Sequence, residues 1–254
     1  MPQTNPIHFV GAGPGDPELI TVKGRRLLAE AELVVYAGSL VPKALVAGLA
    51  AEVHDSAPLH LDEIISLMVA AWQAGKKVVR LHTGDPAIYG AIKEQMVELD
   101  KKSIPYLVVP GVSSATATAA ALKAELTLPE VSQTVIITRR AGRTPVPAGE
   151  DLVSLAAHQA TMLILLSVGM IDKVVADLLA GGYPLTTPVA VVEKVSWPEE
   201  RVIRGTIADI ADKVTAAGIT KTAIIAVGEA FGHGELIAVS KLYDKDFGHG
   251  CREV

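Results

Sequence analysis

Three glycines crowd into the stretch "VGAGPGDPELIT", residues 10–21, directly after an apolar run near the start of the chain. Gly11, Gly13 and Gly15 carry no Cβ, so the backbone here can turn sharply and approach a ligand closely. The first chemistry to test is therefore the binding of phosphate by backbone N–H groups, as in the G-x-G-x-x-G loop of dinucleotide-binding proteins.

The stretch departs from that dinucleotide loop in two ways. Its glycines alternate, and Pro14 removes a backbone N–H at a position where a phosphate would need one. The acidic residue that would bind a ribose hydroxyl is also missing, because the second apolar run ends in "YAG", residues 36–38. The chain contains no G-x-x-x-x-G-K-[ST] motif either, so a nucleoside triphosphate is not predicted.

Metal and nucleophilic chemistry are not favoured by the sequence. The seven histidines are scattered, and none forms an H-x-x-x-H pair that would place two imidazoles on one helix face. The single cysteine, Cys251, cannot form a disulfide or a multi-thiol metal site within the chain. No serine stands in a G-x-S-x-G elbow, so acyl-enzyme chemistry is not predicted.

Three further loops follow apolar runs of strand length: "YAGSLV" (36–41), "HTGDPAIYG" (82–90) and "PGVSS" (110–114). Glycine and proline in any one of them have an ordinary explanation as turn formers. The carboxyl ends of parallel strands share one edge of a sheet, however, and ligands of open α/β sheets bind there. We therefore expect the four loops to lie together and to form a binding site.

The elements around these loops predict a two-domain α/β protein. From residue 7 to about 115, short apolar runs alternate with amphipathic helical segments, which is typical of βαβ units and a parallel sheet. After about residue 122 strand-like runs dominate, and "PVAVVEKVSWPEERVIRGT" (188–206) predicts two strands joined by a turn, hence a mixed sheet. We place the boundary within "LKAELTLPEVS", which gives domains 1–122 and 123–254.

Composition and charge indicate which compartment and which classes of partner to expect for this protein. Half of the 254 residues are hydrophobic, enough for a globular core, whereas the longest apolar run is about ten residues against the roughly 20 that a membrane span needs. The N-terminal segment lacks the features of a secretory signal, so we expect a cytoplasmic protein without a membrane partner. A net charge of −5 gives no overall attraction to nucleic acid.

One local stretch is basic. Residues 131–149 contain no acidic residue and include Arg139, Arg140 and Arg143. Two interpretations remain open for this stretch: a solvated loop, or a patch that binds an anion.

Taken together and in order, "VGAGPGDPELIT", "VVRLHTGDPAIYG", "VVPGVSS" and "AIIAVG" resemble the tetrapyrrole (corrin/porphyrin) methyltransferase family, and the resemblance covers nearly the whole chain. It implies two α/β domains, a homodimer, and a cleft between the domains for the cofactor S-adenosylmethionine, which leaves as S-adenosylhomocysteine. A cofactor bound in such a cleft also explains why the first glycine loop departs from the dinucleotide-binding pattern. The resemblance implies cofactor contacts at Pro14, Gly84, Asp85, Ile88, Ser113, Ser114, Val168, Ala190 and Ala223, with no metal.

Within the family, "VVYAGSLV", "TRRAGRTPVP" and "SWPEERVIRGT" look like the group that methylates C11 of precorrin-4 or cobalt-precorrin-4 in cobalamin biosynthesis. Members that methylate uroporphyrinogen III carry an aspartate where this chain has Ala37. The substrate carboxylates would need local cations, and the implied substrate residues are Arg139, Arg140, Arg143, Tyr36 and Ser39, followed by Lys43, Lys93 and Lys194.

The residue that would remove a proton is not identified by the sequence. Tyr89, His82 and Asp85 are candidates because they lie on the second loop, and Asp85 has the alternative role of holding the cofactor. The alternatives to a C11-methyltransferase are a relative acting on another precorrin, on uroporphyrinogen III, on a protein or on ribosomal RNA, and a sensor that binds an adenosyl ligand without catalysis.

Overall fold

The computed structural model describes residues 5–232, 240–243, 245, 247–248 and 250, so Cys251 lies outside the described residues. The chain forms two compact units. The first comprises Met1–Ala117 and Ser196–Pro198, and the second comprises Thr118–Val195 and Glu199–Val254. The unit boundary falls inside helix α4 (Ser114–Leu122), whereas the sequence-based boundary after residue 122 falls at the end of that helix.

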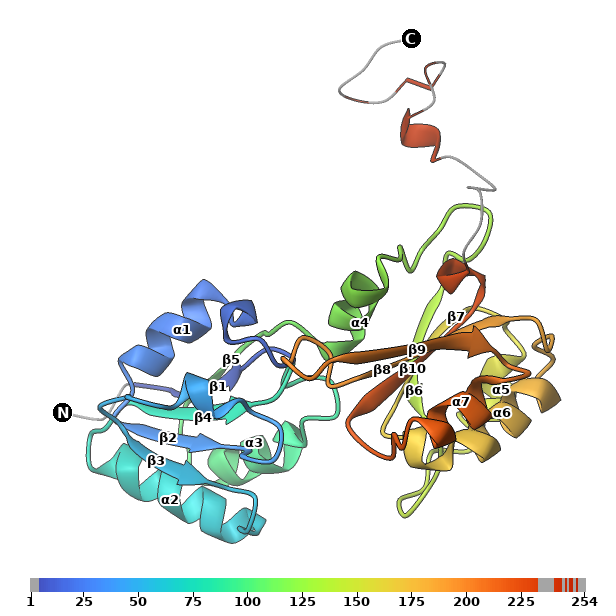
Figure 1. Cartoon of the computed structure of the whole chain (residues 1–254). Helices are drawn as coiled ribbons and strands as arrows, with labels where there is room; N and C mark the ends of the chain where they lie inside the picture. The colour runs from blue at the N-terminus through green and yellow to red at the C-terminus, as the bar shows by residue number, and fades with distance from the viewer. Residues whose placement is uncertain (1–4, 233–239, 244, 246, 249, 251–254) are drawn as a thin grey trace. The chain divides into compact units, whose positions relative to one another are not determined.

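The first unit contains a five-stranded parallel sheet in the order β3-β2-β4-β1-β5 (Figure 1). Strands β1, β2 and β5 consist largely of apolar residues, the edge strand β3 is mostly polar and exposed, and β4 in the centre is buried at every position. This arrangement places the carboxyl ends of β2, β4, β1 and β5 next to one another, as the sequence predicts. The strands are β1 (Ile7–Gly11), β2 (Leu33–Tyr36), β3 (Glu52–Asp55), β4 (Val78–His82) and β5 (Tyr106–Val109).

Helices cover both faces of this sheet (Figure 1). One core contains Leu28 of α1 together with Val79 and Leu81 of β4, and the other contains residues of α2 and α3 together with Val78 of β4. Successive residues of β4 therefore alternate between the two cores, as strand geometry requires. The elements are η1 (Pro17–Leu19), α1 (Val22–Ala29), η2 (Lys43–Leu45), α2 (Leu61–Gln73) and α3 (Ile92–Lys101).

The second unit contains a five-stranded mixed sheet in the order β6-β7-β10-β8-β9. Strands β6 and β7 are parallel, whereas the remaining pairs are antiparallel, and β8 and β9 form the hairpin that the sequence predicts. The helices pack on an apolar core that contains Met162, Val191 and Ile225. The elements are β6 (Val135–Arg139), α5 (Leu152–Ala156), β7 (Thr161–Leu165), η3 (Val168–Met170), α6 (Ile171–Ala180), β8 (Pro188–Glu193), β9 (Arg201–Thr206), α7 (Ile210–Ala216), β10 (Ala223–Val227), η4 (Glu229–Phe231) and η5 (Lys241–Tyr243).

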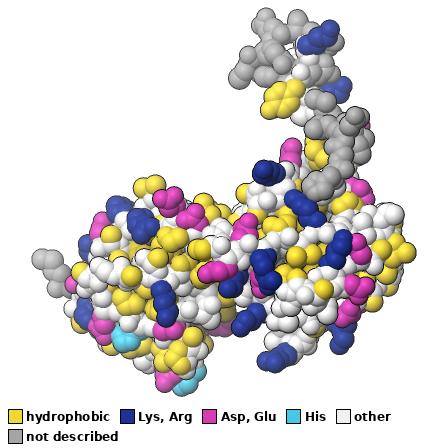
Figure 2. All heavy atoms as spheres, viewed as in Figure 1, with side chains coloured by type: hydrophobic (Ala, Val, Ile, Leu, Met, Phe, Trp, Pro, Cys, Tyr) yellow, Lys and Arg dark blue, Asp and Glu magenta, His cyan; other side chains and the backbone are white. Residues whose placement is uncertain are grey.

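The predicted fold class, two α/β units with one parallel and one mixed sheet, is confirmed. Acidic and basic side chains are interspersed over the face of the molecule that Figure 2 shows. Among the described residues, no helix combines the length and apolar character needed to cross a membrane.

Candidate active site

The loops that follow β1 and β4 are hydrogen-bonded to each other beyond the ends of their parallel strands. Ala12 donates its N–H to the carbonyl of His82 over 2.7 Å. Gly84 donates to the carbonyl of Gly13 over 2.7 Å, and Gly13 donates to the carbonyl of Gly84 over 3.3 Å. This reciprocal pair is an antiparallel bridge that joins the first and second loops into one structure.

The glycines let three loops approach one another at van der Waals distance. A Cβ built on Gly11 would lie 2.6 Å from both the Gly111 Cα and the Gly84 carbonyl oxygen. A Cβ on Gly111 would lie only 2.1 Å from that same oxygen. The loops after β1, β4 and β5 therefore form a single cluster, and part of its glycine content serves contacts between loops rather than contacts with a ligand.

Asp85 ties the second loop to the third. Its Oδ1 accepts the N–H of Ala87 over 2.7 Å, and its Oδ2 accepts the N–H of Gly111 over 3.0 Å. A carboxylate has about four acceptor directions, so each oxygen keeps one for a ligand. Asp85 thus has a structural function in the loop cluster and is still able to accept hydrogen bonds from a bound molecule.

The second loop turns back on itself through left-handed backbone. Gly84 has φ of +58°, and the non-glycine residues Tyr89 and Ala91 have φ of +53° and +48°. A Cβ on Gly90 would lie 2.1 Å from the carbonyl oxygen of Pro86, so the turn closes tightly. The side chain of Tyr89 is 47% exposed and is accessible from the loop surface.

The third loop leads into α4. Ser113 and Ser114 are half-buried, and the Ser113 Oγ accepts the N–H of Ala115 over 3.2 Å. The carbonyl of Ser113 accepts the N–H of Ala117 over 3.0 Å, so Ser113 caps the first turn of the helix.

A segment distant in sequence supports the first loop. Trp197, between β8 and β9, donates its indole N–H to the carbonyl of Pro14 over 2.9 Å, and the Ser196 Oγ accepts the N–H of Asp16 over 3.0 Å. A Cβ on Gly15 would lie 2.2 Å from the Trp197 ring. The sequence predicts only a turn in this segment, since nothing local indicates a contact across more than 180 positions.

His82, a candidate proton acceptor, lies in the core instead of on the loop surface. It is 5% exposed, and its ring centroid lies 6.0 Å from that of Phe9. Burial and the nearby charge of Arg80 lower the pKa of His82 to about 3, so the imidazole is neutral and a weak base. Its Nε2 has no hydrogen-bond partner among the described residues.

The side chain of Tyr36 is 9% exposed and belongs to the same core as Leu28. The Tyr36 carbonyl accepts two hydrogen bonds from Ser56, and Gly38, two residues further on, donates its N–H to Asp55 over 3.0 Å. Ser39 is exposed in the loop after β2. Of these two substrate candidates, the structure leaves Ser39 at the surface and places Tyr36 in the core.

Two of the three arginines of the basic stretch are engaged within the second unit. Arg139 donates to the carbonyls of Thr144 and Pro145 over 3.1 and 2.6 Å, which fixes the following loop. Arg140 forms a half-buried ion pair with Asp177 at 2.5 Å. Arg143 is exposed, and no described residue forms a hydrogen bond or an ion pair with its side chain. Lys43 and Lys93 are exposed as well, and Lys194 is half-buried.

The cofactor candidates of the second unit are Val168, Ala190 and Ala223. All three are buried, with at most 8% of each residue exposed. Their side chains carry no hydrogen-bonding group, so any polar contact from these positions would come from backbone atoms. In the part of the chain that the structure describes, no group of three or more histidine, cysteine or acidic residues is arranged to hold a metal ion.

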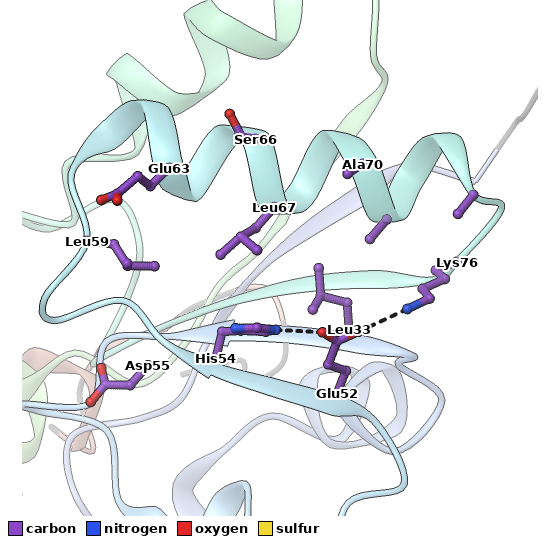
Figure 3. A pocket seen from close by; sticks show the side chains of 12 residues that line it. Leu33, Glu52, His54, Asp55, Leu59, Glu63, Ser66, Leu67, Ala70 and Lys76 are labelled. Atoms are coloured by element: carbon purple, nitrogen blue, oxygen red, sulfur yellow. Dashed lines mark hydrogen bonds and ion pairs between the residues drawn. The ribbon is translucent and has the colours of Figure 1, made fainter.

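A groove of about 730 Å³ lies away from the three glycine loops, between α2 and the edge strand β3 (Figure 3). Its apolar wall includes Leu59 and Leu67. At its rim Glu52 accepts hydrogen bonds from His54 over 2.8 Å and from Lys76 over 3.0 Å, and these contacts lower the pKa of Glu52. Glu52, His54 and Lys76 are thus paired with one another.

Comparison with known proteins gives consistent results. The family described as Tetrapyrrole (Corrin/Porphyrin) Methylases matches residues 6–211. The chain is 57% identical to a cobalt-precorrin-4 C(11)-methyltransferase of Methanocaldococcus jannaschii, over 100% of this chain and 98% of that one. It is 49% identical to a precorrin-4 C(11)-methyltransferase of Pseudomonas aeruginosa, over 96% and 97% of the two chains.

Solved structures agree with these sequence relatives. A cobalt-precorrin-4 methyltransferase has a TM-score of 0.87 and 48% identity, over 89% of this chain and 96% of that one. A uroporphyrin-III C-methyltransferase from Thermus thermophilus, solved with S-adenosylhomocysteine, has a TM-score of 0.75 and 30% identity, over 89% and 93% of the chains. The fold of this chain therefore has its counterpart in solved structures, and the chain belongs to the tetrapyrrole (corrin/porphyrin) methylase family.

Proposed function

We propose that this protein is an S-adenosylmethionine-dependent C-methyltransferase that methylates C11 of precorrin-4, or of cobalt-precorrin-4, in cobalamin biosynthesis. The observation that carries the proposal is the 57% identity to a cobalt-precorrin-4 C(11)-methyltransferase over the whole chain. The three-loop cluster of the first unit supports it, since this cluster lies at the sheet edge where open α/β proteins bind ligands.

The chemistry of the loops fits the proposed cofactor. S-adenosylmethionine presents an amine, a carboxylate, ribose hydroxyls and an adenine, and it supplies an electrophilic methyl group when bound. Backbone N–H and carbonyl groups of glycine-rich loops can bind this mixture of hydrogen-bond donors and acceptors better than a site lined by charged side chains can. The acceptor directions of Asp85 suit the amine or the hydroxyls. We propose the contacts Pro14, Gly84, Asp85, Ile88, Ser113, Ser114, Val168, Ala190 and Ala223.

The protein's part in methyl transfer is positioning. An in-line displacement at a methyl group disperses charge, so it needs alignment and exclusion of water more than acid or base assistance. A loop cluster held by the Gly13–Gly84 bridge and by Asp85 is suited to this task, because its geometry is set before a ligand arrives. For the loss of a proton, Asp85 and Tyr89 are the better placed candidates, since His82 is a buried weak base.

The proposed substrate carries several carboxylates, and exposed cationic side chains would be needed to bind them. Among the proposed substrate residues, Arg143 is the arginine whose guanidinium is not engaged by the described residues. We therefore propose that Arg143 contacts a carboxylate, while Arg139 and Arg140 shape the loop that carries it. Ser39, exposed in the loop after β2, is a further candidate in addition to Arg143.

Methylation of uroporphyrinogen III is the main alternative. A uroporphyrinogen III methyltransferase of Methanosarcina barkeri is 35% identical to this chain, well below the C(11)-methyltransferases. Ala37, where such enzymes are expected to carry aspartate, also disfavours it.

We propose in addition that the enzyme is a cytoplasmic homodimer with no nucleic-acid or membrane partner. Light scattering of the purified protein tests the dimer.

Incubation with methyl-labelled S-adenosylmethionine and a panel of acceptors tests the function. We expect label to enter precorrin-4, its cobalt form, or both, and to leave uroporphyrinogen III unlabelled. Label that appears only in uroporphyrinogen III or in a protein acceptor would refute the proposed substrate. Binding of S-adenosylhomocysteine without transfer to any acceptor would instead favour a sensor.

A further inference from the structure

Two buried polar side chains lie beneath the loop that follows β4. Arg80, on β4 itself, is 5% exposed, and Gln95, on α3, is 4% exposed. Arg80 alternates with Val79 and Leu81, so it lies on the sheet face that α2 and α3 cover. Arg80 lies in the quoted motif "VVRLHTGDPAIYG", just before the loop 82–90, and Gln95 lies beyond that loop; the sequence predicts no site role for either residue.

These two side chains form a continuous path of hydrogen bonds to the end of the loop. Arg80 donates from Nη1 to the carbonyl of Val35 over 3.1 Å and from Nε to the Gln95 Oε1 over 3.0 Å. Gln95 in turn donates from Nε2 to the carbonyl of Ala91 over 3.1 Å. The central strand β4 and its neighbour β2 are thereby linked to the residue that precedes α3.

The path ends where the backbone is strained. Ala91 and Tyr89 both have left-handed backbone without being glycine, and Gly90 between them is packed against the carbonyl of Pro86. Such conformations persist only where the surrounding structure holds them. The hydrogen bond from Gln95 to the Ala91 carbonyl helps to hold the left-handed backbone at Ala91. Arg80 fixes the orientation of the Gln95 amide through its bond to Oε1.

Stability alone does not explain an arginine at this position. No acidic residue of the described ranges forms an ion pair with Arg80, and its guanidinium remains charged at neutral pH although burial lowers its pKa to about 10. A buried charge without a counter-charge is costly, and apolar residues of similar volume often stabilise a core better. What an apolar residue does not provide is a pair of directed N–H donors.

We propose that Arg80 and Gln95 are positioning residues that hold residues 85–91 in the shape that binds the cofactor. The inference rests on the proposed function, because it takes S-adenosylmethionine as the ligand of this loop. Arg80 and Gln95 act through Ala91 and do not themselves contact the reacting atoms.

Gln95→Glu separates positioning from stability. Glutamate still accepts the hydrogen bond from Arg80 and supplies the missing counter-charge, but it has no N–H to donate to Ala91. We expect an unchanged or higher melting temperature together with about tenfold weaker binding of S-adenosylhomocysteine. In turnover, KM for S-adenosylmethionine should rise while KM for the tetrapyrrole stays within about twofold of the wild-type value.

Arg80→Met and Leu99→Ala complete the test. Arg80→Met removes the buried charge and both donors, so it should bind S-adenosylhomocysteine about tenfold more weakly without a matching loss of melting temperature. Leu99, on the same helix, is fully buried and has no hydrogen-bonding side chain. Leu99→Ala should therefore lower the melting temperature and leave the Kd of the folded protein unchanged.

The test compares the calorimetric Kd for S-adenosylhomocysteine and the melting temperature of the wild type with those of the three variants. Wild-type affinity in both Gln95→Glu and Arg80→Met would overturn the inference. So would an affinity loss that follows the melting temperature across all three variants, because a general structural effect would then suffice. Wild-type protein that binds no S-adenosylhomocysteine would overturn the proposed function, and the inference with it.

Discussion

Asp85→Ala should weaken binding of S-adenosylhomocysteine about a hundredfold. The substitution removes the acceptors of two backbone N–H groups, those of Ala87 and Gly111, at 2.7 and 3.0 Å. A hydrogen bond to a charged group contributes about 1.5–3 kcal/mol, and the bond to Ala87 is exposed and lies at the lower end. The two bonds together amount to about 3 kcal/mol, which is lost from binding because the ligand must then order the released loops itself, and each 1.4 kcal/mol is a factor of ten in affinity. Any direct contact of Asp85 with the ligand would add to this loss.

Titration calorimetry with S-adenosylhomocysteine measures the effect, and thermal unfolding monitors the fold. Asp100→Ala is a control, because the Asp100 carboxylate also accepts a hydrogen bond, in its case from the Tyr106 hydroxyl over 3.2 Å, but lies in the last turn of α3. Its affinity should equal that of the wild type. An Asp85→Ala variant that is folded and binds with unchanged affinity would refute both the loop connection and the cofactor contact assigned to Asp85.

Three further predictions concern pH, the first loop and the substrate. Because the pKa of His82 is about 3 in the folded protein and 6.5 as its ordinary value, its contribution to stability is complete above pH 6.5 and is lost as the pH falls toward 3. Urea unfolding should show the wild type losing about 2 kcal/mol more than His82→Phe between pH 7 and pH 5, and equal losses would contradict the burial of a neutral imidazole. Trp197→Phe removes the N–H donated to Pro14 but keeps the ring, so it should cost about 1 kcal/mol in urea unfolding, and no loss would speak against this contact. In steady-state kinetics, Arg143→Ala should raise KM for the tetrapyrrole about tenfold at unchanged cofactor affinity. Arg140→Ala should mainly lower the melting temperature, because it breaks the ion pair with Asp177. A raised KM in Arg140→Ala and a lowered melting temperature in Arg143→Ala would instead make Arg140 the substrate contact and Arg143 the structural residue.

Much of the fold follows from local sequence patterns. The alternation of apolar runs with amphipathic segments predicts the parallel sheet, since each run is long enough for a buried strand and each amphipathic segment covers one face. Helix α2 illustrates this: apolar residues recur at helical spacing from Leu61 to Met68, and Gly75, with φ of +84°, follows its end. Patterns of this kind act over a few residues and can be read directly.

The details of the site were less predictable, because they depend on contacts between distant segments. Glycine at position 11 is needed because Gly111 and Gly84 approach it, which no local pattern reveals. Trp197 contacts a loop more than 180 positions away. The ion pair of Arg140 with Asp177 likewise depends on where α6 lies, which the arginine-rich stretch itself does not indicate.

The position of the transferred methyl group is the most direct test of the central claim. The purified protein would be incubated with precorrin-4, or its cobalt form, and S-adenosylmethionine labelled with ¹³C in the methyl group, and the product examined by carbon NMR. A single new methyl resonance correlated with C11 of the macrocycle is the expected result. A methyl group at any other ring carbon, or no transfer to either form of precorrin-4 by protein that binds S-adenosylhomocysteine, would contradict the claim.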